Sequence, residues 1–343
     1  MVLKSGKSSL LLIVSYDTTK LMTKPPFKLT PRILNLVSQI HETLGELKTS
    51  ILIKPSVKLR KENKIKTVKH SLAIEGNELS EEQITALLEK KKVSGPKKQI
   101  QEVVNALNLY EKLHDFNPLI EKDLLKAHTH LMKNLMLEPG KYRSKNVGVL
   151  KGSKISRVAP QAKFVPELMK NLFVFLKSEG DMPTLIKGCI FHYELKFIHP
   201  FEDGNGRMGR LWQQLILMKH SPIFEFVSVE TLIHQKQQTY YKVLEACDKA
   251  GDSTLYIEFS LEVIRDVLKE FKSEYRPARG TSLDRITAAL ELFGTNEFTR
   301  KEYLNLHKNV STATGSRDLA EAVENGLILR NGEKSLAVYK RSP

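Results

Sequence analysis

The segment HPFEDGNGRMGR, residues 199–210, decides how the middle of this chain folds. His199 stands directly before a proline, and a residue in that position is pushed out of helical geometry, so a preceding helix should end there. Gly204, Asn205 and Gly206 can adopt positive φ angles and turn successive backbone N–H groups inward. A new helix should begin near Gly206, where its macrodipole also favours an anion. The segment therefore predicts two helices joined by an anion-binding loop.

The side chains of the same segment indicate phosphate chemistry. Arg207 and Arg210 are three residues apart, so both can project from the first helical turn and fork onto phosphate oxygens. Asp203 lies at the loop entrance, where a carboxylate can hold Mg²⁺ between two phosphates. His199 is suited to deprotonating a hydroxyl near neutral pH. A Gly-Asn-Gly turn or a histidine before proline is usually structural when it occurs alone, but together these residues predict nucleotidyl or phosphoryl transfer.

The segment matches the Fic motif H-P-F-x-D-G-N-G-R-x-x-R at every fixed position, and the chain resembles the Fic-domain protein adenylyltransferases that have an N-terminal inhibitory helix. The resemblance implies that AMP moves from ATP to a Ser, Thr or Tyr hydroxyl of a target protein, or of the chain itself, while pyrophosphate leaves. It implies that His199 is the general base for that hydroxyl. Some members of the family transfer other phosphate-containing groups, and some mainly remove AMP.

The same resemblance assigns ATP and Mg²⁺ to the motif. The implied ATP-binding residues are Asp203, Gly204, Asn205, Gly206, Arg207, Met208, Gly209 and Arg210. Those implied to hold the α- and β-phosphates are Gly204, Asn205, Gly206 and Arg207. Arg210 would hold the γ-phosphate, and Asp203 would bind the metal ion.

A second, shorter motif lies upstream. The segment SLAIEG, Ser71 to Gly76, fits the family's inhibitory pattern [S/T]-x-x-x-E-[G/N]. Such a short pattern is ordinarily just a helix end, but here it stands before an intact Fic motif. The resemblance implies that Ser71, Glu75 and Gly76 are inhibitory residues and that Glu75 pairs with Arg210. An Arg–carboxylate pair would then compete with an Arg–phosphate pair for the same guanidinium.

Three other features have competing interpretations. Residues 147–160 predict a β-hairpin that, by resemblance, would pair with the backbone of a target; the alternative is a plain surface hairpin. Tyr240 and Tyr241 fall where relatives line the adenine pocket, or they are core residues. We reject His128 and His130 as a metal pair, because residues two apart on a helix do not converge.

The rest of the chain predicts a mainly α fold: a Fic helical fold with a β-hairpin flap, plus a small α+β winged-helix domain. The predicted organisation is a disordered N-terminus (1–24), an N-terminal helical region with the inhibitory helix (25–115), a Fic catalytic core (116–275) and a winged helix (281–343). Predicted body helices include 57–75, 99–114, 121–136, 166–178, 231–250 and 254–273. Ser80 and Thr299 should begin helices through capping boxes with Gln83 and Glu302, and Ser311 should cap another.

Composition limits the classes of partner. The 343 residues are 41% hydrophobic and 27% charged, with no apolar stretch near the ~18 residues of a membrane span. Two cysteines, Cys189 and Cys247, fit a reducing compartment, so we expect a cytoplasmic protein. The formal charge is +15, but residues 281–343 carry only 9 Lys and Arg against 8 Asp and Glu. That balance favours a target-docking or self-associating winged helix over a DNA-binding regulator, which is the competing hypothesis.

Overall fold

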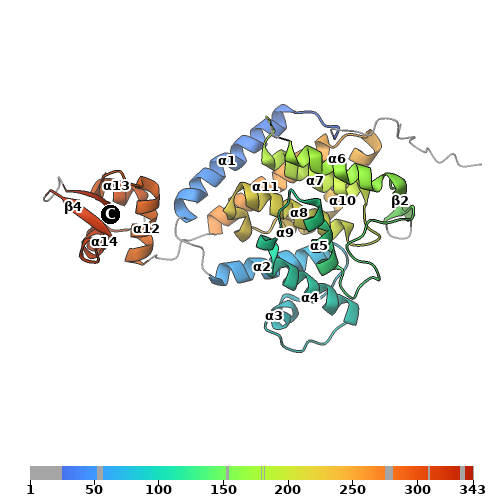
Figure 1. Cartoon of the computed structure of the whole chain (residues 1–343), viewed down its shortest axis with the longest axis horizontal. Helices are drawn as coiled ribbons and strands as arrows, with labels where there is room; N and C mark the ends of the chain where they lie inside the picture. Colours follow the sequence, from blue (N-terminus) through green and yellow to red (C-terminus); the bar gives the residue numbers. More distant parts are fainter. Residues whose placement is uncertain are drawn as a thin grey trace, which may run out of the picture.

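The structure is a computed structural model and describes residues 25–51, 57–151, 154–178, 180, 182–274, 281–307, 310–332 and 337–342. It is mainly helical with two small sheets (Figure 1). This confirms the predicted fold class. Hydrophobic side chains from Ile33 to Leu268 form one continuous core, so the predicted N-terminal region and catalytic region pack as one body.

The body is built from eleven α-helices and one hairpin within the described ranges. The helices are α1 (Pro31–Ile51), α2 (Val57–Ala73), α3 (Glu81–Leu88), α4 (Lys97–Glu111), α5 (Glu121–Leu131), α6 (Val165–Lys177), α7 (Thr184–Ile198), α8 (Asn205–His220), α9 (Val229–Gln235), α10 (Gln237–Ala250) and α11 (Thr254–Glu274). Short 3₁₀ turns cover Leu113–Asp115, Ala162–Phe164 and Pro222–Phe226. The antiparallel hairpin pairs β1 (Gly148–Lys151) with β2 (Lys154–Val158).

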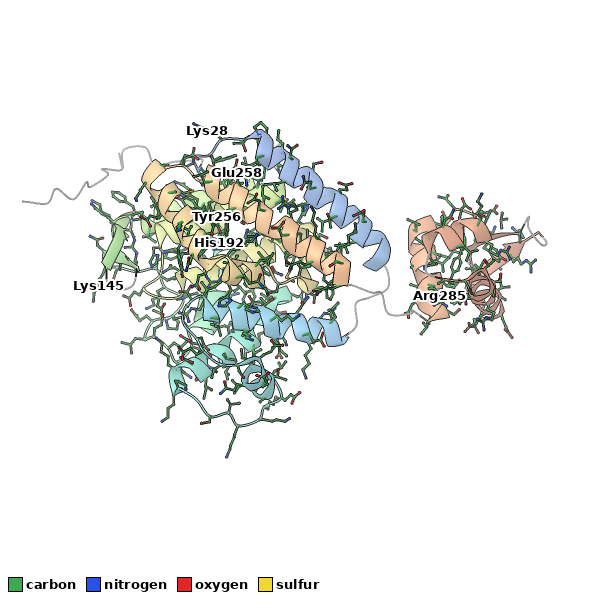
Figure 2. The ribbon with its side chains drawn as sticks, turned by 180° about the vertical axis from the view of Figure 1, so that it is seen from behind. Lys28, Lys145, His192, Tyr256, Glu258 and Arg285 are labelled. Atoms are coloured by element: carbon green, nitrogen blue, oxygen red, sulfur yellow. The ribbon has the colours of Figure 1, made fainter. Side chains whose placement is uncertain are left out.

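Helices α7 and α8 form the centre of the body and are buried along most of their length. Two glycines permit their close approach. A Cβ on Gly209 would lie 2.8 Å from Cδ2 of His192, and one on Gly188 would lie 3.3 Å from Ile216. Helix α1 lies along α11, and Thr30 before α1 donates a hydrogen bond of 2.6 Å to Glu258 (Figures 1 and 2). The two helices that flank the loop of residues 199–204 are thus fixed in the body.

Several predicted helix boundaries differ from the structure, among them three in the body. Helix α2 ends at Ala73 rather than residue 75, because the chain turns there toward Gly76. The helix predicted over 121–136 stops at Leu131, where the Asn105 side chain donates to the carbonyls of Leu131 and Lys133 and so caps the helix end. The single helix predicted over 231–250 is two helices, α9 and α10, with a break at Lys236. The first difference concerns the turn that carries Glu75, and the third concerns α10, which carries Tyr241; both residues lie near the candidate site.

The C-terminal residues form a module with its own core. It contains α12 (Ser282–Phe293), α13 (Arg300–Leu306) and α14 (Thr312–Glu324), with strands β3 (Phe298–Thr299), β4 (Ile328–Asn331) and β5 (Val338–Arg341) in the antiparallel order β3-β5-β4. The predicted capping box of Thr299 and Glu302 is present, as is the cap at Ser311. Inside the core, Arg285 donates two hydrogen bonds of 2.6 Å to Asp318. Three helices followed by a hairpin is the predicted order, and the winged-helix assignment itself stays a prediction.

Within the part of the chain that the structure describes, no helix has the length and apolar composition to cross a bilayer.

The capping box predicted at Ser80 is confirmed: its hydroxyl accepts from the Gln83 N–H, and the Gln83 side chain accepts from the Ser80 N–H.

Candidate active site

His199 ends α7 in the left-handed region, with φ 53° and ψ 58°. A non-glycine residue rarely adopts that conformation, so surrounding contacts must hold it there. The contacts come from Arg143, which is 3% exposed. Its Nε donates to the His199 carbonyl at 2.7 Å, an Nη donates to the Ile198 carbonyl at 3.3 Å, and its backbone N–H donates to the Pro200 carbonyl at 2.9 Å. The predicted general base is therefore fixed through its backbone.

Arg143 also reaches the base of the hairpin. Its two terminal nitrogens donate to the carbonyls of Lys145 at 2.9 Å and Pro160 at 2.5 Å. One guanidinium thus ties the ends of the predicted flap to the backbone of His199. Sequence reasoning missed this residue, and no local pattern could have identified it, because all these partners are backbone carbonyls.

The loop after His199 is closed by the side chain of Asn205. Its Oδ1 accepts from the Phe201 N–H at 2.9 Å, and its Nδ2 donates to the Phe201 carbonyl at 2.8 Å. Asn205 and Gly206 already belong to α8, and among the predicted loop residues only Gly204 has a positive φ, 85°. The prediction of three positive φ angles was wrong, because the Asn205 amide clamps the loop and lets the helix begin one residue earlier. The N–H groups available for the predicted anion are consequently those of the first turn of α8.

His128 is a second positioning residue that sequence reasoning missed, since it was considered only as a metal ligand. Its ring stacks on Phe201 with centroids 3.7 Å apart. Nδ1 accepts from the Gly140 N–H at 2.8 Å, so Nε2 carries the proton and donates to the Asp203 carbonyl at 3.0 Å. Burial lowers the pKa of His128 to about 4. Position 204 favours glycine beside this ring, because its φ is 85° and a Cβ there would lie 3.3 Å from His128 Nε2 and 2.9 Å from Met132 Sδ.

Glu75 reaches α8 from the end of α2. Gly76, with φ 90°, turns the chain, and the N–H of Asn77 bonds back to the Leu72 carbonyl at 3.1 Å. The Glu75 carboxylate then lies against the first turn of α8: a Cβ added to Gly206 would be 2.1 Å from Glu75 Oε1. Only a glycine leaves room for an anion this close to the helix N-terminus.

The predicted pair of Glu75 and Arg210 is present as an ion pair. Arg210 Nη2 donates to Glu75 Oε1 at 2.9 Å and to the Ser71 carbonyl at 2.8 Å, while Nε donates to Ser71 Oγ at 3.1 Å. Arg210 is 1% exposed and the Glu75 side chain 34% exposed. Burial by itself would raise the pKa of Glu75, but Arg210, with Lys196 and Arg207, outweighs it and lowers that pKa to about 2. The carboxylate is therefore ionised at neutral pH.

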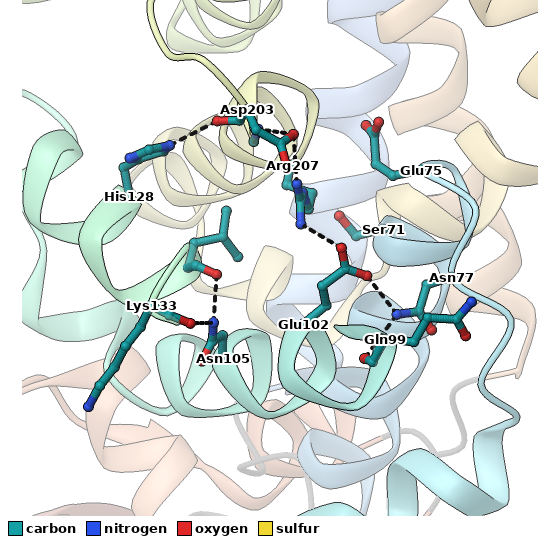
Figure 3. Close-up of polar contacts among 12 residues, drawn as sticks. Ser71, Glu75, Asn77, Gln99, Glu102, Asn105, His128, Lys133, Asp203 and Arg207 are labelled. Atoms are coloured by element: carbon teal, nitrogen blue, oxygen red, sulfur yellow. Dashed lines mark hydrogen bonds and ion pairs between the residues drawn. The ribbon is translucent and has the colours of Figure 1, made fainter. Parts of the chain in front are cut away.

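Arg207 is held by two other carboxylates. Its terminal nitrogens contact Glu102 Oε1 at 3.3 Å and Asp203 Oδ1 at 3.0 Å (Figure 3). Among the described residues, Arg207 Nε and Arg210 Nη1 are buried nitrogens with no hydrogen-bond partner. Buried donors without partners are rare, and these two belong to arginines at the start of one helix, although they are not the only such atoms among the described residues. This donor set fits a ligand with several anionic oxygens.

The metal prediction rests on Asp203, whose side chain is 57% exposed. In the described ranges no three His, Cys, Asp or Glu side chains converge on a point that could hold a metal ion. Mg²⁺ is commonly bound by one or two carboxylates together with substrate phosphates. A single exposed carboxylate beside the predicted phosphate site therefore fits Mg²⁺ that arrives with a nucleotide.

The remaining predicted residues lie around this centre. Met208 is fully buried in the core, and Gly209 faces His192, so neither contacts Glu75 in the way Gly206 does. Tyr240 is buried, and its hydroxyl lies 3.2 Å from His192 Nε2 in the interior marked by His192 and Tyr256 in Figure 2.

Tyr241 is half-buried and donates a hydrogen bond of 3.3 Å to the Ile74 carbonyl, directly before Glu75. The ATP-binding role of Met208, Gly209, Tyr240 and Tyr241 stays a prediction.

A buried carboxyl, Glu230, borders the same small enclosed space as Arg210, and burial raises its pKa to about 7.

Comparisons with known proteins identify the relatives of this chain. Residues 118–217 match the Fic/DOC family. A crystal structure of a Fic family protein from Desulfovibrio desulfuricans G20 is 37% identical, with a TM-score of 0.69, over 93% of this chain and 98% of that one. The protein adenylyltransferase fic-1 of Caenorhabditis briggsae is 30% identical over 240 residues, which are 66% of this chain and 44% of the relative. The protein adenylyltransferase Fic of Nematostella vectensis is 29% identical over 55% of its length, so the chain spans about half of these curated relatives. The chain belongs to the Fic family.

Proposed function

We propose that this protein is a protein adenylyltransferase that transfers AMP from ATP to a hydroxyl of a target protein or of itself, and that Glu75 inhibits it. One observation carries the proposal. The Glu75 carboxylate lies against Gly206 at the N-terminus of α8 and is paired with Arg210. A helix N-terminus with an arginine is a site for phosphate, and a carboxylate occupies it here.

The chemistry follows from the groups around that helix. The target hydroxyl gives its proton to His199 as its oxygen bonds to the α-phosphorus. The bond from the α-phosphorus to the bridging oxygen breaks, and pyrophosphate leaves with that electron pair. The first turn of α8 and Arg207 stabilise the negative charge of the phosphates. Mg²⁺, when bound with the nucleotide, would be held by Asp203 and would offset further phosphate charge.

Glu75 would act by competition. Arg210 cannot pair fully with a γ-phosphate while its Nη2 is bonded to Glu75. The carboxylate also repels the nucleotide phosphates, since its low pKa keeps it charged. ATP would then bind with its α-phosphate turned away from the line of attack.

Several finer features of this proposal stand on the resemblance. The flap would pair with the target backbone, Tyr240 and Tyr241 would contact the adenine, and residues 281–343 would dock a target or a second copy of the chain. A cytoplasmic location rests on the two cysteines, both of which are free and buried.

The test compares wild type, Glu75→Gly and the double variant Glu75→Gly/His199→Ala in a lysate. Two ATP preparations are used, one labelled at the α-phosphate and one at the γ-phosphate. We expect protein labelling from α-labelled ATP only, stronger with Glu75→Gly and lost with the double variant. Labelling from γ-labelled ATP would indicate phosphoryl transfer and contradict the proposed reaction.

A further inference from the structure

We propose that Glu102 is a second inhibitory carboxylate of this site: it holds Arg207 as Glu75 holds Arg210, and Asn77 couples the two. The inference rests on the proposed function, because it assumes that Arg207 serves the phosphates of a nucleotide. It concerns a residue of α4, outside both sequence motifs.

The contact between Glu102 and Arg207 is sheltered from water. The Arg207 side chain is 6% exposed and that of Glu102 is 14% exposed, with 3.3 Å between Nη1 and Oε1. Asp203 also pairs with Arg207, at 3.0 Å, but its side chain is 57% exposed. Asp203 can therefore turn toward a cation in solvent, whereas Glu102 is enclosed beside the guanidinium. Breaking a buried pair costs more than breaking an exposed one.

Asn77 connects this pair to the inhibitory segment. Its Nδ2 donates to Glu102 Oε2 at 2.9 Å and to the Gln99 carbonyl at 3.1 Å (Figure 3). Its Oδ1 accepts from the Leu79 N–H at 3.2 Å. Asn77 follows Glu75 by two residues, in the turn that ends α2. The same short turn thus places one carboxylate on Arg210 and orients another carboxylate toward Arg207.

The two pairs should act on different parts of a nucleotide. Glu75 lies on Arg210, which the resemblance assigns to the γ-phosphate, and Glu102 lies on Arg207, which it assigns to the α- and β-phosphates. Removal of Glu75 should therefore favour ATP over ADP. Removal of the Glu102 charge should favour ADP over AMP.

Glu102→Gln is the sharpest perturbation. Both Glu102 oxygens accept hydrogen bonds, one from Arg207 and one from Asn77. Glutamine has a single side-chain acceptor and an NH₂ group, so it can serve only one of these two donors. The volume stays the same while the charge and one contact are lost. Glu111→Gln is the matched control, since Glu111 is also on α4 and ion-paired, to Lys64 at 3.1 Å, but does not touch the motif.

The experiment measures AMP and ADP affinity by isothermal titration calorimetry with the full chain and Mg²⁺. We expect Glu102→Gln to bind ADP about tenfold more tightly than wild type and to bind AMP more tightly by a smaller factor, because AMP offers Arg207 only one phosphate. Glu111→Gln should match wild type for both nucleotides. In an Arg207→Ala background, Glu102→Gln should no longer improve ADP binding. Asn77→Ala should give part of the gain, because Glu102 loses its orienting donor.

Three results would overturn the inference. The first is unchanged ADP affinity in a Glu102→Gln protein whose thermal unfolding shows that it is folded. This result would contradict the inhibitory role of Glu102 and leave the proposed function intact. Equal gains for AMP and ADP would show a general charge effect rather than competition for Arg207. If Glu75→Gly and wild type bind none of ATP, ADP and AMP, the proposed function fails, and this inference with it. Should Glu102→Gln not fold, Glu102→Ala takes the same tests, since alanine leaves no unpaired amide beside Arg207 and Asn77.

Discussion

Replacing Glu75 by glycine removes one partner of the ion pair at the start of α8. A hydrogen bond between charged groups contributes about 1.5–3 kcal/mol, and the 34% exposure of the Glu75 side chain reduces this by solvent screening to about 1–2 kcal/mol. Each 1.4 kcal/mol or so is one decade in rate, so AMP transfer should rise about tenfold or more. The carboxylate also repels ATP, which adds to the gain.

The same substitution should lower stability. Arg210 is 1% exposed, and without Glu75 it loses its ion-pair partner in a buried position. We expect the free energy of unfolding without ligand to fall by about 1–3 kcal/mol. ATP with Mg²⁺ should raise the unfolding temperature of Glu75→Gly more than that of wild type, because a phosphate then pairs with Arg210.

The assay is self-modification with α-labelled ATP, followed as an initial rate. Its pH dependence provides a second check. The pKa of Glu75 is about 2, below the ordinary value of 4.5, so the carboxylate is charged throughout the neutral range. The rate ratio of variant to wild type should therefore be constant between about pH 6 and about pH 8. Adding Arg210→Ala should abolish the gain, since the released guanidinium is then absent.

An unchanged or lower transfer rate in Glu75→Gly would refute the inhibitory role. In that case, faster loss of AMP from a modified protein in wild type than in Glu75→Gly would show that Glu75 assists hydrolysis instead. Both rates are measurable on the same labelled protein after ATP is removed.

Four further predictions follow from the site and the C-terminal module. His199→Ala should lower AMP transfer by ~10²–10⁴-fold while calorimetry shows ATP affinity close to wild type, because the phosphate contacts come from other residues. Asp203→Ala should weaken the dependence of ATP binding on Mg²⁺, measured by titrating the ion at fixed nucleotide. Burial raises the pKa of Glu230 from 4.5 to about 7, so the folded state binds one more proton than the unfolded state between those pH values. The free energy of unfolding of wild type should therefore fall by up to about 3 kcal/mol as pH rises from 4.5 to about 7. Urea unfolding of Glu230→Gln at both ends of this range should show no such fall. Deleting residues 281–343 should leave self-modification measurable and change target choice or self-association, whereas nanomolar binding of duplex DNA by that module would favour the DNA-binding hypothesis.

Local sequence patterns predicted much of this protein because their partners are close in the chain. The capping boxes at Ser80 and Thr299 involve residues three apart, and both are present. The proline after His199 ends α7 where expected. Gly76 follows the predicted helix 57–75 and has the positive φ that the turn after that helix needs.

Distant contacts were less predictable. Arg143 holds His199 through backbone carbonyls, and His128 holds the Asp203 carbonyl from α5. Every residue offers the same carbonyl group, so such partners leave no pattern in a single sequence. The Asn205 clamp changed the predicted loop geometry for a related reason: its bonds to Phe201 could not be distinguished from a phosphate-binding role before the loop was seen.

The sequence by itself determined the helical class of the protein, the motif at residues 199–210 and, through the Fic resemblance, the pairing of Glu75 with Arg210. Tertiary structure alone decided that Glu102 reaches Arg207 and that Glu230 is buried beside Arg210. The physical reason is the range of the interactions. Caps, turns and helix periodicity are set by neighbours within one or two turns, whereas the placement of a carboxylate against a motif arginine depends on how α2, α4 and α8 pack, which no local pattern records.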